Sequence, residues 1–412
     1  MDPDTNHINP VLSSEDFSRW IKSTRATMKD LAFGPLPFEN ISRHELIEQL
    51  EGFRKSKEKL PTWHKSHNLI YPPKISIEQC SSEQTAEYKA NLLKRHYGSS
   101  LGNKTIADLT GGFGVDAYFM ACAGAKVHHF EINKRLSAIV NHNMKQLNAK
   151  VQCHPQDGIH GIKHHQVDVI YLDPARRDLQ QKKVFRLEDC QPNVLGHLDS
   201  WLNQAEMVMI KTSPMLDLSL GIDQLKTAIE IHVVAVHNEV KELIWCLTKK
   251  IANTPQGLSD PEIYVVNLKN NSATIDHFPW ALTERQVFGP IENYLFEPHA
   301  AWRKVGRYSA LLDRLSMRRI GPNAHLFSAD QPLDFPGRSF RIMEKFKFTK
   351  GVMKQFKNKQ FNVTTRDFPM RVAEIRNMWR IKEGGDQYLF FTTDHEGQKW
   401  IILTEKYPKI QN

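Results

Sequence analysis

Short apolar runs alternate with helix-length amphipathic segments through the middle of the chain, from about residue 104 to residue 270. The first four runs are separated by segments long enough to form a helix. This is the βαβ pattern of a parallel sheet with helices on both faces. The last three runs follow one another closely, which predicts an antiparallel edge. The predicted strands are 104–108, 126–131, 167–172, 206–211, 231–237, 242–248 and 262–268.

The first 95 residues show helical periodicity instead. Ser82 precedes one of the helical patterns and is typical of an N-cap. A loop that contains Pro61, Pro72 and Pro73 separates the second predicted helix from the third. The predicted helices lie near 14–31, 42–58 and 82–96.

The last third of the chain consists of two small modules, at 285–330 and 331–412, which follow a predicted linker at 271–284. We therefore divide the rest of the chain into a helical region at 1–95 and an α/β domain at 96–280. Within the last module the pattern predicts strands at 338–343 and 361–364, a helix at 369–380 and a hairpin from 387 to 404.

Composition excludes several classes of protein. Hydrophobic residues make up 40% and charged residues 25% of the 412 positions, so the chain is neither disordered nor collagen-like. No apolar run approaches the roughly 18 residues of a membrane span, and the N-terminus lacks the basic and apolar regions of a secretory signal. The five cysteines form no C-x-x-C pair, which argues against a zinc ribbon or a disulfide scaffold. We expect a cytoplasmic protein that does not associate with membranes.

Histidines are the remaining candidate metal ligands. Four of them lie between residues 154 and 165, without a cysteine or carboxylate at metal-ligand spacing. The pair His128-His129 falls inside a predicted strand, where packing accounts for it. The sequence therefore predicts no metal site.

The net charge of +9 is located in the last third of the chain. Residues 285–412 contain 23 Lys and Arg against 13 Asp and Glu, whereas the preceding 284 residues contain 32 basic and 33 acidic side chains. A basic region attached to a neutral one suggests a polyanionic partner, and nucleic acid is the first candidate. A lysine-rich surface that only keeps the protein in solution is the alternative. The lysines between 345 and 359 interleave with Phe346, Phe348 and Phe356, which either stack on bases or pack in a core.

The clearest chemical signal lies in the stretch 104–116. A strand is followed by Asp108-Leu109-Thr110-Gly111-Gly112-Phe113-Gly114-Val115-Asp116 and then by a helix. Glycines between a first strand and a helix let the backbone approach a ligand more closely than a Cβ would permit. Glu131 ends the next strand, where a carboxylate accepts hydrogen bonds from the ribose hydroxyls of a nucleoside-containing cofactor.

Two cofactors fit this pattern. Gly112-x-Gly114-x-x-Ala117 matches the dinucleotide fingerprint, and Glu131 lies at the expected distance. S-adenosylmethionine is the alternative. Asp108 at the tip of the first strand favours it, because a carboxylate suits a ligand with an ammonium group better than a pyrophosphate.

Two further strand ends favour S-adenosylmethionine. Asp157 follows a third-strand region at 150–154, where its side chain could hold an adenine amine. Asp173-Pro174-Ala175-Arg176 ends the next strand and would line the crevice at the carboxyl ends of the strands. Each of these four motifs taken alone could be a turn or a helix cap. That interpretation does not account well for their joint occurrence at four successive strand ends.

In the order of these four motifs, the chain resembles the class I S-adenosylmethionine-dependent methyltransferases. Over about 340 residues it is similar to a bacterial family of methyltransferases, seen in Bacteroidetes, that ends in a THUMP-like domain. The matching stretches are SIEQCSSEQTAEYKA (76–90), DLTGGFGVDAYF (108–119), DPARRD (173–178), FRLEDCQP (185–192), KTSPMLDL (211–218), EPHAAWRKVGRYSALL (297–312), RIGPNAHLFS (319–328), DFPGRSFRI (334–342) and EGGDQYLFFTT (383–393).

The resemblance implies an α/β fold with a Rossmann-like methyltransferase sheet and helices on both of its faces, after a helical N-terminal region. It also implies two small α+β modules, ferredoxin-like over 285–330 and THUMP-like over 331–412. S-adenosylmethionine would be the cofactor. By resemblance its contacts would be Asp108, Thr110, Gly111, Gly112, Gly114, Glu131, Ile132, Asp157 and Asp173.

The fourth motif limits the chemistry. Enzymes that methylate exocyclic amines of bases show Asp or Asn, then Pro-Pro and an aromatic residue, whereas here Ala175 and Arg176 replace the second proline and the aromatic. An arginine plane can stack on a base or pair with a phosphate. The candidate catalytic residues are therefore Asp173, Pro174 and Arg176. Cys190 lacks the Pro-Cys context of a nucleophile for C5 methylation.

Other basic residues have two interpretations. Lys211, at the end of the fifth strand, either lines the substrate side of the pocket or only precedes a turn. Arg177 and the pair Lys182-Lys183 either bind phosphate or lie in a solvated loop.

The sequence thus predicts an S-adenosylmethionine-dependent methyltransferase acting on RNA, either tRNA or rRNA, that binds phosphates through residues 285–412. The alternatives are a methyltransferase of a protein or small molecule, and an RNA-binding protein without turnover. An NAD-dependent enzyme ranks last, because nothing resembles a hydride-transfer site. The modified atom and the oligomeric state do not follow from the sequence.

Overall fold

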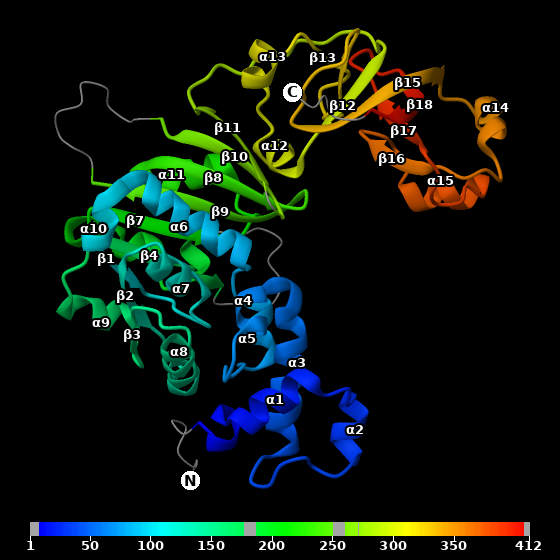
Figure 1. Cartoon of the computed structure of the whole chain (residues 1–412). Coiled ribbons are helices and arrows are strands. Elements are labelled where there is room, and N and C mark those ends of the chain that lie inside the picture. The colour runs from blue at the N-terminus through cyan, green and yellow to red at the C-terminus, as the bar shows by residue number, and fades with distance from the viewer. Residues whose placement is uncertain (1–7, 177–186, 250–259, 271, 408–412) are drawn as a thin grey trace. The chain divides into compact units, whose positions relative to one another are not determined.

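The chain forms two compact units in the computed structural model (Figure 1), each considered by itself below. The first comprises residues 1–231 and 242–259, and the second comprises residues 232–241 and 260–412. The structure describes residues 8–176, 187–249, 260–270 and 272–407. Within these ranges, none of the helices has the length and apolar character needed to cross a membrane.

Five parallel strands form one end of a large sheet, in the order β3-β2-β1-β4-β7 with β3 at the edge. All four neighbouring pairs among them are parallel, as the βαβ pattern predicts. This order places the carboxyl ends of all five strands at one edge, where α/β folds bind their ligands. The strands are β1 (Thr105–Asp108), β2 (Lys126–Phe130), β3 (Val151–His154), β4 (Val169–Leu172) and β7 (Met207–Thr212).

Helices cover both faces of this sheet. His129 and Phe130 are neighbours on β2, so their side chains point to opposite faces. A Cβ added at Gly114 would meet both His129 and the α8 residue Val140, whereas a Cβ at Gly161 of α9 would meet Phe130. Helices α8 and α9 therefore lie on opposite faces. The helices that connect the strands are α7 (Val115–Cys122), α8 (Lys134–Gln146), α9 (Gly158–Gly161) and α10 (Val194–Gln204).

In the first unit β9 continues the sheet beyond β7, whereas β10, β11 and most of β8 belong to the second unit. Strand β9 pairs antiparallel with β7, and β11 pairs antiparallel with β10, which confirms the predicted antiparallel edge. His237 and Asn238 join β8 to β9 and both have positive φ, as tight hairpin turns require. These strands are β8 (Ala228–Val236), β9 (Glu239–Thr248), β10 (Glu262–Lys269) and β11 (Ser272–Pro279).

Strand β11 corrects the predicted linker at 271–284. Its sequence is mostly polar and only Phe278 is buried, so the pattern of apolar positions does not reveal a strand. The strand forms because all eight of its residues pair in register with β10, from Lys269 opposite Ser272 to Glu262 opposite Pro279.

The helical N-terminal region is confirmed, with two additional short helices in the predicted proline loop. Pro61 occupies the first turn of α4 (Pro61–Lys65), and Pro73 is the N-cap of α5 (Lys74–Gln79). Proline lacks an N–H, and the first turn of a helix does not need one. The prolines therefore begin helices here instead of marking a loop. The helix predicted at 14–31 is divided into α1 (Glu15–Ser23) and α2 (Met28–Phe33), whereas those predicted at 42–58 and 82–96 are α3 (Arg43–Lys59) and α6 (Glu83–Tyr97).

These helices pack against the start of the parallel sheet. One hydrophobic core joins Leu46, Leu50 and Trp63 of the N-terminal region to Phe113 of the glycine loop and Val140 of α8. Trp63 and Phe113 lie 6.0 Å apart between ring centroids. The N-terminal helices therefore support the glycine loop from behind.

A buried ion cluster joins the same parts of the first unit. Lys89 of α6 is completely buried, and its Nζ lies 3.1 Å from Oδ1 of Asp116 in α7 and 2.7 Å from Oε1 of Glu242 in β9. The Ser81 hydroxyl accepts a hydrogen bond of 3.3 Å from the same nitrogen and donates one of 2.8 Å to Asp116. One ammonium thus holds an N-terminal helix, the helix after the glycine loop and the antiparallel part of the sheet.

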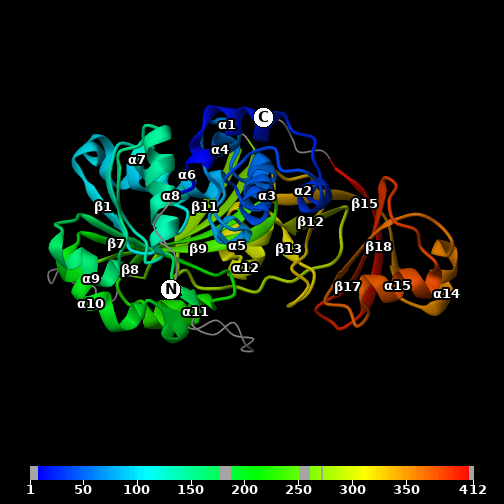
Figure 2. The same ribbon diagram turned by 90° about the horizontal axis from the view of Figure 1, so that it is seen from below.

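The second unit contains a seven-stranded sheet in the order β13-β14-β12-β15-β18-β17-β16 within the described residues. Helices α14 (Lys350–Met353) and α15 (Val372–Trp379) share a hydrophobic core with β16, β17 and β18, the end of the sheet beside which both views show them (Figures 1 and 2). The predicted strands, helix and final hairpin of the last module are confirmed, although β15 extends four residues beyond its predicted end. The strands are β12 (Tyr294–Pro298), β13 (Arg318–Arg319), β14 (Phe327–Ala329), β15 (Gly337–Lys347), β16 (Asn362–Arg366), β17 (Gln387–Thr393) and β18 (Lys399–Lys406).

Three arginines surround one buried carboxylate in this unit. Glu297 of β12 is 1% exposed and accepts hydrogen bonds from Nε of Arg338 (2.6 Å) and Nε of Arg366 (2.8 Å). Arg303, in α12 (Ala300–Val305), contributes a third cation at 3.7 Å. Their side chains remain 25–37% exposed. The cluster ties β12 to β15 and β16 and carries a local surplus of two positive charges.

The Lys89 cluster gives the first prediction. Lys89→Met leaves two buried carboxylates without their cation, which lowers the free energy of unfolding by about 3–5 kcal/mol. Urea unfolding of the full chain measures this loss. Lys94→Met, an exposed lysine of the same helix, is the matched control and should change the stability little. Equal stability of the two variants would contradict the assigned role of Lys89.

Candidate cofactor site

The glycine loop begins where β1 ends and leads into α7. Gly112 (φ +53°) and Gly114 (φ +74°) adopt the left-handed conformation that favours glycine. A Cβ at Gly111 would lie 2.2 Å from Nε2 of His129, and one at Gly114 would lie 2.7 Å from Cγ1 of Val140. A Cβ at Gly112 would meet only the Thr110 carbonyl oxygen, at 3.8 Å. Two glycines thus permit close packing inside the protein, and Gly112 leaves its outer side open to a ligand.

His129 fills the space behind the loop. Its side chain is fully buried, and burial lowers its pKa to about 4, so the ring is neutral at physiological pH. This confirms the packing interpretation for His129.

Glu131 follows β2 directly and contacts the loop. Its Oε2 accepts a hydrogen bond of 2.9 Å from the Gly112 amide, and its Oε1 accepts one of 2.7 Å from the Asn133 amide. Burial raises the pKa of Glu131 in spite of these hydrogen bonds. Each carboxylate oxygen has a second lone pair that can accept a hydrogen bond from a hydroxyl group.

Asp108 lies at the bottom of the site. Its side chain is buried, and its Oδ1 accepts a hydrogen bond of 3.1 Å from the Thr110 amide. Burial raises its pKa well above the ordinary value, and the nearby carboxylates of Asp116, Asp173 and Glu131 raise it further. The carboxyl end of β1 is therefore an environment of excess negative charge.

Asp116 is a member of this group that the sequence analysis quoted without a role. Burial alone would raise its pKa, but the cations of Lys89 and Lys211 and the hydroxyls of Ser81 and Tyr171 lower it below the ordinary value. The Tyr171 hydroxyl donates a hydrogen bond of 2.8 Å to its Oδ2. Asp116 is thus a fixed negative charge. The position of Asp116 in the sequence, two residues after Gly114 of the glycine motif, could have indicated its place at the site.

Asp173 is joined both to the glycine loop and to β7. Its backbone amide donates a hydrogen bond of 2.6 Å to Oγ1 of Thr110, and its Oδ2 lies 2.5 Å from Nζ of Lys211. Burial would lower the pKa of Lys211, but Asp173, Glu242 and Asp116 raise it above the ordinary value. Lys211 therefore lines the site, one of its two predicted interpretations, and orients the Asp173 carboxylate.

The predicted adenine side is less enclosed. Asp157 is the N-cap of α9, where its Oδ1 accepts hydrogen bonds from the amides of Ile159 (2.7 Å) and His160 (3.3 Å). Ile132, directly after Glu131, leaves 70% of its surface exposed. An exposed isoleucine next to the Glu131 carboxylate offers an apolar surface to a flat ring. Met215, 56% exposed and shortly after β7, is a similar apolar side chain that the sequence analysis did not identify.

The residues after Asp173 form a short hairpin. Pro174 is buried, and the backbone of Ala175 and Arg176 pairs with that of Gln191 and Cys190. Cys190 is fully buried, so its thiol cannot reach a substrate as a nucleophile. The side chain of Arg176, together with Arg177, Lys182 and Lys183, lies outside the described residues.

Comparison with known proteins confirms the resemblance found in the sequence. Two adjacent segments match protein-family models, a ferredoxin-like domain at residues 294–336 and a THUMP domain-like family at residues 337–406. A crystal structure from Porphyromonas gingivalis W83, described as a putative methyltransferase, is 28% identical with a TM-score of 0.84. The similarity covers 96% of this chain and 98% of that one. No curated protein matches this chain.

More distant solved structures share parts of the fold. A Thermus thermophilus 16S rRNA N2 G1207 methyltransferase, in complex with AdoMet and guanosine, is 13% identical, with a TM-score of 0.34 and coverage of 44% of this chain and 46% of that one. A structure from Listeria monocytogenes, described as a putative class I S-adenosylmethionine-dependent methyltransferase, is 12% identical, with a TM-score of 0.38 and coverage of 64% of this chain and 90% of that one. At these scores the two structures indicate nothing about the substrate of this chain.

Asp108 gives a prediction about stability and pH. Because the pKa of Asp108 is raised in the folded protein, its protonated form is compatible with the fold and its ionised form destabilises the fold. The stability that the protonated side chain confers is therefore lost as the pH rises through the raised pKa. Asp108→Asn should therefore be at least as stable as the wild type at pH 7.5, and this advantage should shrink as the pH falls toward the ordinary aspartate value of about 3.9. Urea unfolding at several pH values measures it, with the exposed Asp199→Asn as control. Lower stability of Asp108→Asn at pH 7.5 would contradict this account.

Proposed function

We propose that the protein is an S-adenosylmethionine-dependent methyltransferase that modifies RNA in the cytoplasm. The observation that carries the cofactor assignment is the negative charge at the end of β1. Asp108 is buried there among the carboxylates of Asp116, Asp173 and Glu131. A cationic ligand relieves their repulsion, and S-adenosylmethionine carries both an ammonium and a sulfonium charge.

The same charge argues against a dinucleotide. A pyrophosphate bound at the glycine loop would bring negative charges close to the buried carboxyl of Asp108, at a large electrostatic cost in a low-dielectric site. The dinucleotide fingerprint of the loop and the position of Glu131 alone do not separate the two cofactors. The burial of Asp108 supports S-adenosylmethionine over a dinucleotide.

The residues of the site then take distinct roles. Glu131 accepts the ribose hydroxyls, Asp108 with the loop from Thr110 to Gly114 holds the amino-acid part, and Asp157 with Ile132 contacts the adenine. The cofactor supplies an activated methyl group for an in-line displacement. The chain itself mainly orients the two reactants, which is a large contribution to such a reaction.

The acceptor is assigned to the end of β4. Nζ of Lys211 lies 2.5 Å from Oδ2 of Asp173 and orients this carboxylate, so that the group can hold a polar acceptor at the edge of the site. Asp173 and Pro174 border the methyl donor by resemblance, and Arg176 follows them on the same short hairpin. We assign Asp173, Pro174 and Arg176 to acceptor binding.

The basic second unit supports RNA as the acceptor. Six lysines of the THUMP-like segment are exposed: Lys345, Lys347, Lys350, Lys354, Lys357 and Lys359. The interleaved phenylalanines are not available for base stacking, because Phe346, Phe348 and Phe356 pack in the core of this segment. These lysines are therefore placed to contact phosphates, a mode of binding without base recognition.

The cofactor assignment is tested by isothermal titration with S-adenosylhomocysteine and, in parallel, NAD. We expect micromolar binding of S-adenosylhomocysteine and none of NAD. Asp108→Asn and Glu131→Ala should each weaken binding about 10- to 100-fold, as expected for loss of a hydrogen bond to a charged group. Glu58→Ala, an exposed glutamate of α3, is the control. Preference for NAD, or equal affinity of all variants, would overturn the cofactor assignment.

RNA binding is tested by the salt dependence of affinity. In fluorescence anisotropy with labelled bulk tRNA, the triple variant Lys354→Gln, Lys357→Gln, Lys359→Gln should reduce the slope of log K against log salt by about 2, since each phosphate contact on a single strand contributes about 0.7. The same charge change at the exposed Lys57, Lys94 and Lys126 of the first unit is the control. Equal slopes for the two triple variants would contradict the assigned surface.

A further inference from the structure

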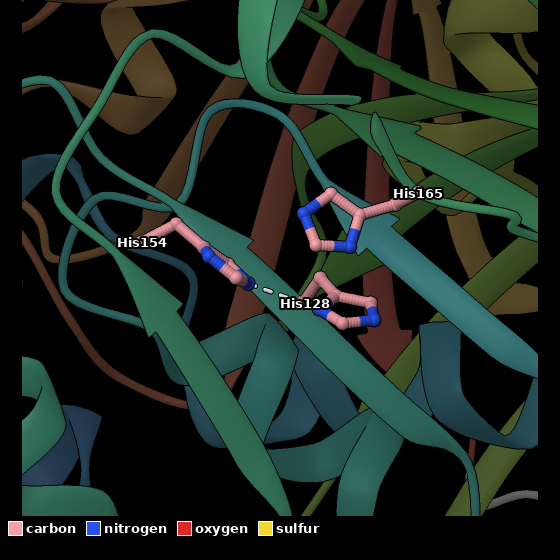
Figure 3. Close-up of side chains that lie close together, drawn as sticks. All are labelled: His128, His154 and His165. Carbon is pink, nitrogen blue, oxygen red and sulfur yellow. Dashed lines mark hydrogen bonds between the residues drawn. The ribbon is translucent and has the colours of Figure 1, made fainter. Parts of the chain in front are cut away.

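Three histidine rings converge on one face of the sheet (Figure 3). His128 lies in β2, His154 ends β3, and His165 follows the short 3-10 helix Ile162–His164. His128 shares its strand face with Phe130, whereas His129 points to the opposite face, behind the glycine loop. The group therefore lies across the sheet from the glycine loop and takes no part in the proposed methyl transfer.

The ring nitrogens are close enough to share an ion. Nδ1 of His128 lies 2.9 Å from Nε2 of His154, and the His165 ring centroid is 4.4 Å from that of His128 and 4.9 Å from that of His154. One nitrogen from each residue lies within 4.8 Å of the other two. Tetrahedral zinc with bonds of about 2.0–2.1 Å places neighbouring ligand nitrogens about 3.3 Å apart, so small ring rotations bring all three into position.

The surroundings hold the cluster in place and leave it accessible to an ion. Phe130 stacks on His154 at 4.6 Å with an interplanar angle of 17°, which fixes that ring. The His154 carbonyl oxygen accepts hydrogen bonds from the amides of Glu131 (3.1 Å) and Gln156 (2.9 Å), which fix its backbone. All three side chains are only partly buried, so an ion can enter from solvent.

We propose that His128, His154 and His165 form a binding site for a divalent transition-metal ion of the zinc class. Three imidazoles with an open fourth position are a known ligand set for zinc, and imidazole also suits cobalt, nickel and copper. The sequence analysis excluded a metal because no cysteine or carboxylate stood at ligand spacing. The fold instead supplies the ligands from three segments that are far apart in the sequence.

Cobalt(II) is the probe for the test, because its visible spectrum reports the number and kind of its ligands. Titration of the tag-free full chain should give one equivalent of bound Co²⁺ with the visible bands of four-coordinate cobalt. Zn²⁺ should displace it, because zinc binds such sites more tightly. The Zn²⁺-loaded chain should also unfold at a higher temperature than the metal-free chain.

Matched variants test which histidines bind the cobalt ion. His165→Gln should weaken cobalt binding at least about tenfold, since even residues that only support a metal ligand contribute that much. His128→Asn should give the same loss of cobalt binding. Agreement between the two variants shows that the loss does not come from misfolding of one of them. His164→Gln changes the exposed neighbouring histidine and should bind like the wild type.

Three results would overturn the proposal. They are the absence of stoichiometric binding, equal loss of binding in His164→Gln and His165→Gln, and a near-ultraviolet charge-transfer band that assigns the ion to cysteine. None of these results depends on the cofactor or on methyl transfer, so the proposal fails or stands independently of the proposed function.

Discussion

The site depends on the ion pairs that the Lys89 ammonium forms with two buried carboxylates. The ammonium is completely buried between Asp116 and Glu242, and removing a charge from water costs several kcal/mol unless partners replace the solvent. Those partners come from the helix after the glycine loop and from the antiparallel part of the sheet. The ion cluster thus fixes where α7 begins, and with it the position of the loop from Thr110 to Gly114. The N-terminal helices support this arrangement through the core around Trp63 and Phe113.

Negative charge remains at the site after these pairs have formed. Lys89 and Lys211 neutralise only part of the group formed by Asp108, Asp116, Glu131, Asp173 and Glu242. The burial of Asp108 makes this surplus effective, because a charge in a low-dielectric environment is poorly screened. In the proposed function this surplus favours a cationic cofactor in the first unit, and the excess of lysine and arginine in the second unit favours a polyanion. These opposite charges match the two reactants of RNA methylation.

Elements and loops with a strong local signal could be predicted from the sequence. The parallel strands show apolar runs at βαβ spacing, and the glycine loop and Glu131 follow directly from them. Strand β11 could not be predicted, because pairing with β10 and not its own apolar pattern defines it. The helices at Pro61 and Pro73 were missed because proline both breaks and begins helices. Contacts such as Lys211 with Asp173, or His128 with His154 and His165, join distant segments and leave no local signal.

The most direct test of the account is the transfer of a radiolabelled methyl group from S-adenosylmethionine to cellular macromolecules. The purified full chain would be incubated with total RNA and, separately, with total protein from the source cell. The account predicts label in the RNA fraction that ribonuclease releases and proteinase does not. Label confined to the protein fraction would contradict the RNA assignment. The absence of transfer to either fraction at saturating S-adenosylmethionine would contradict the account as a whole.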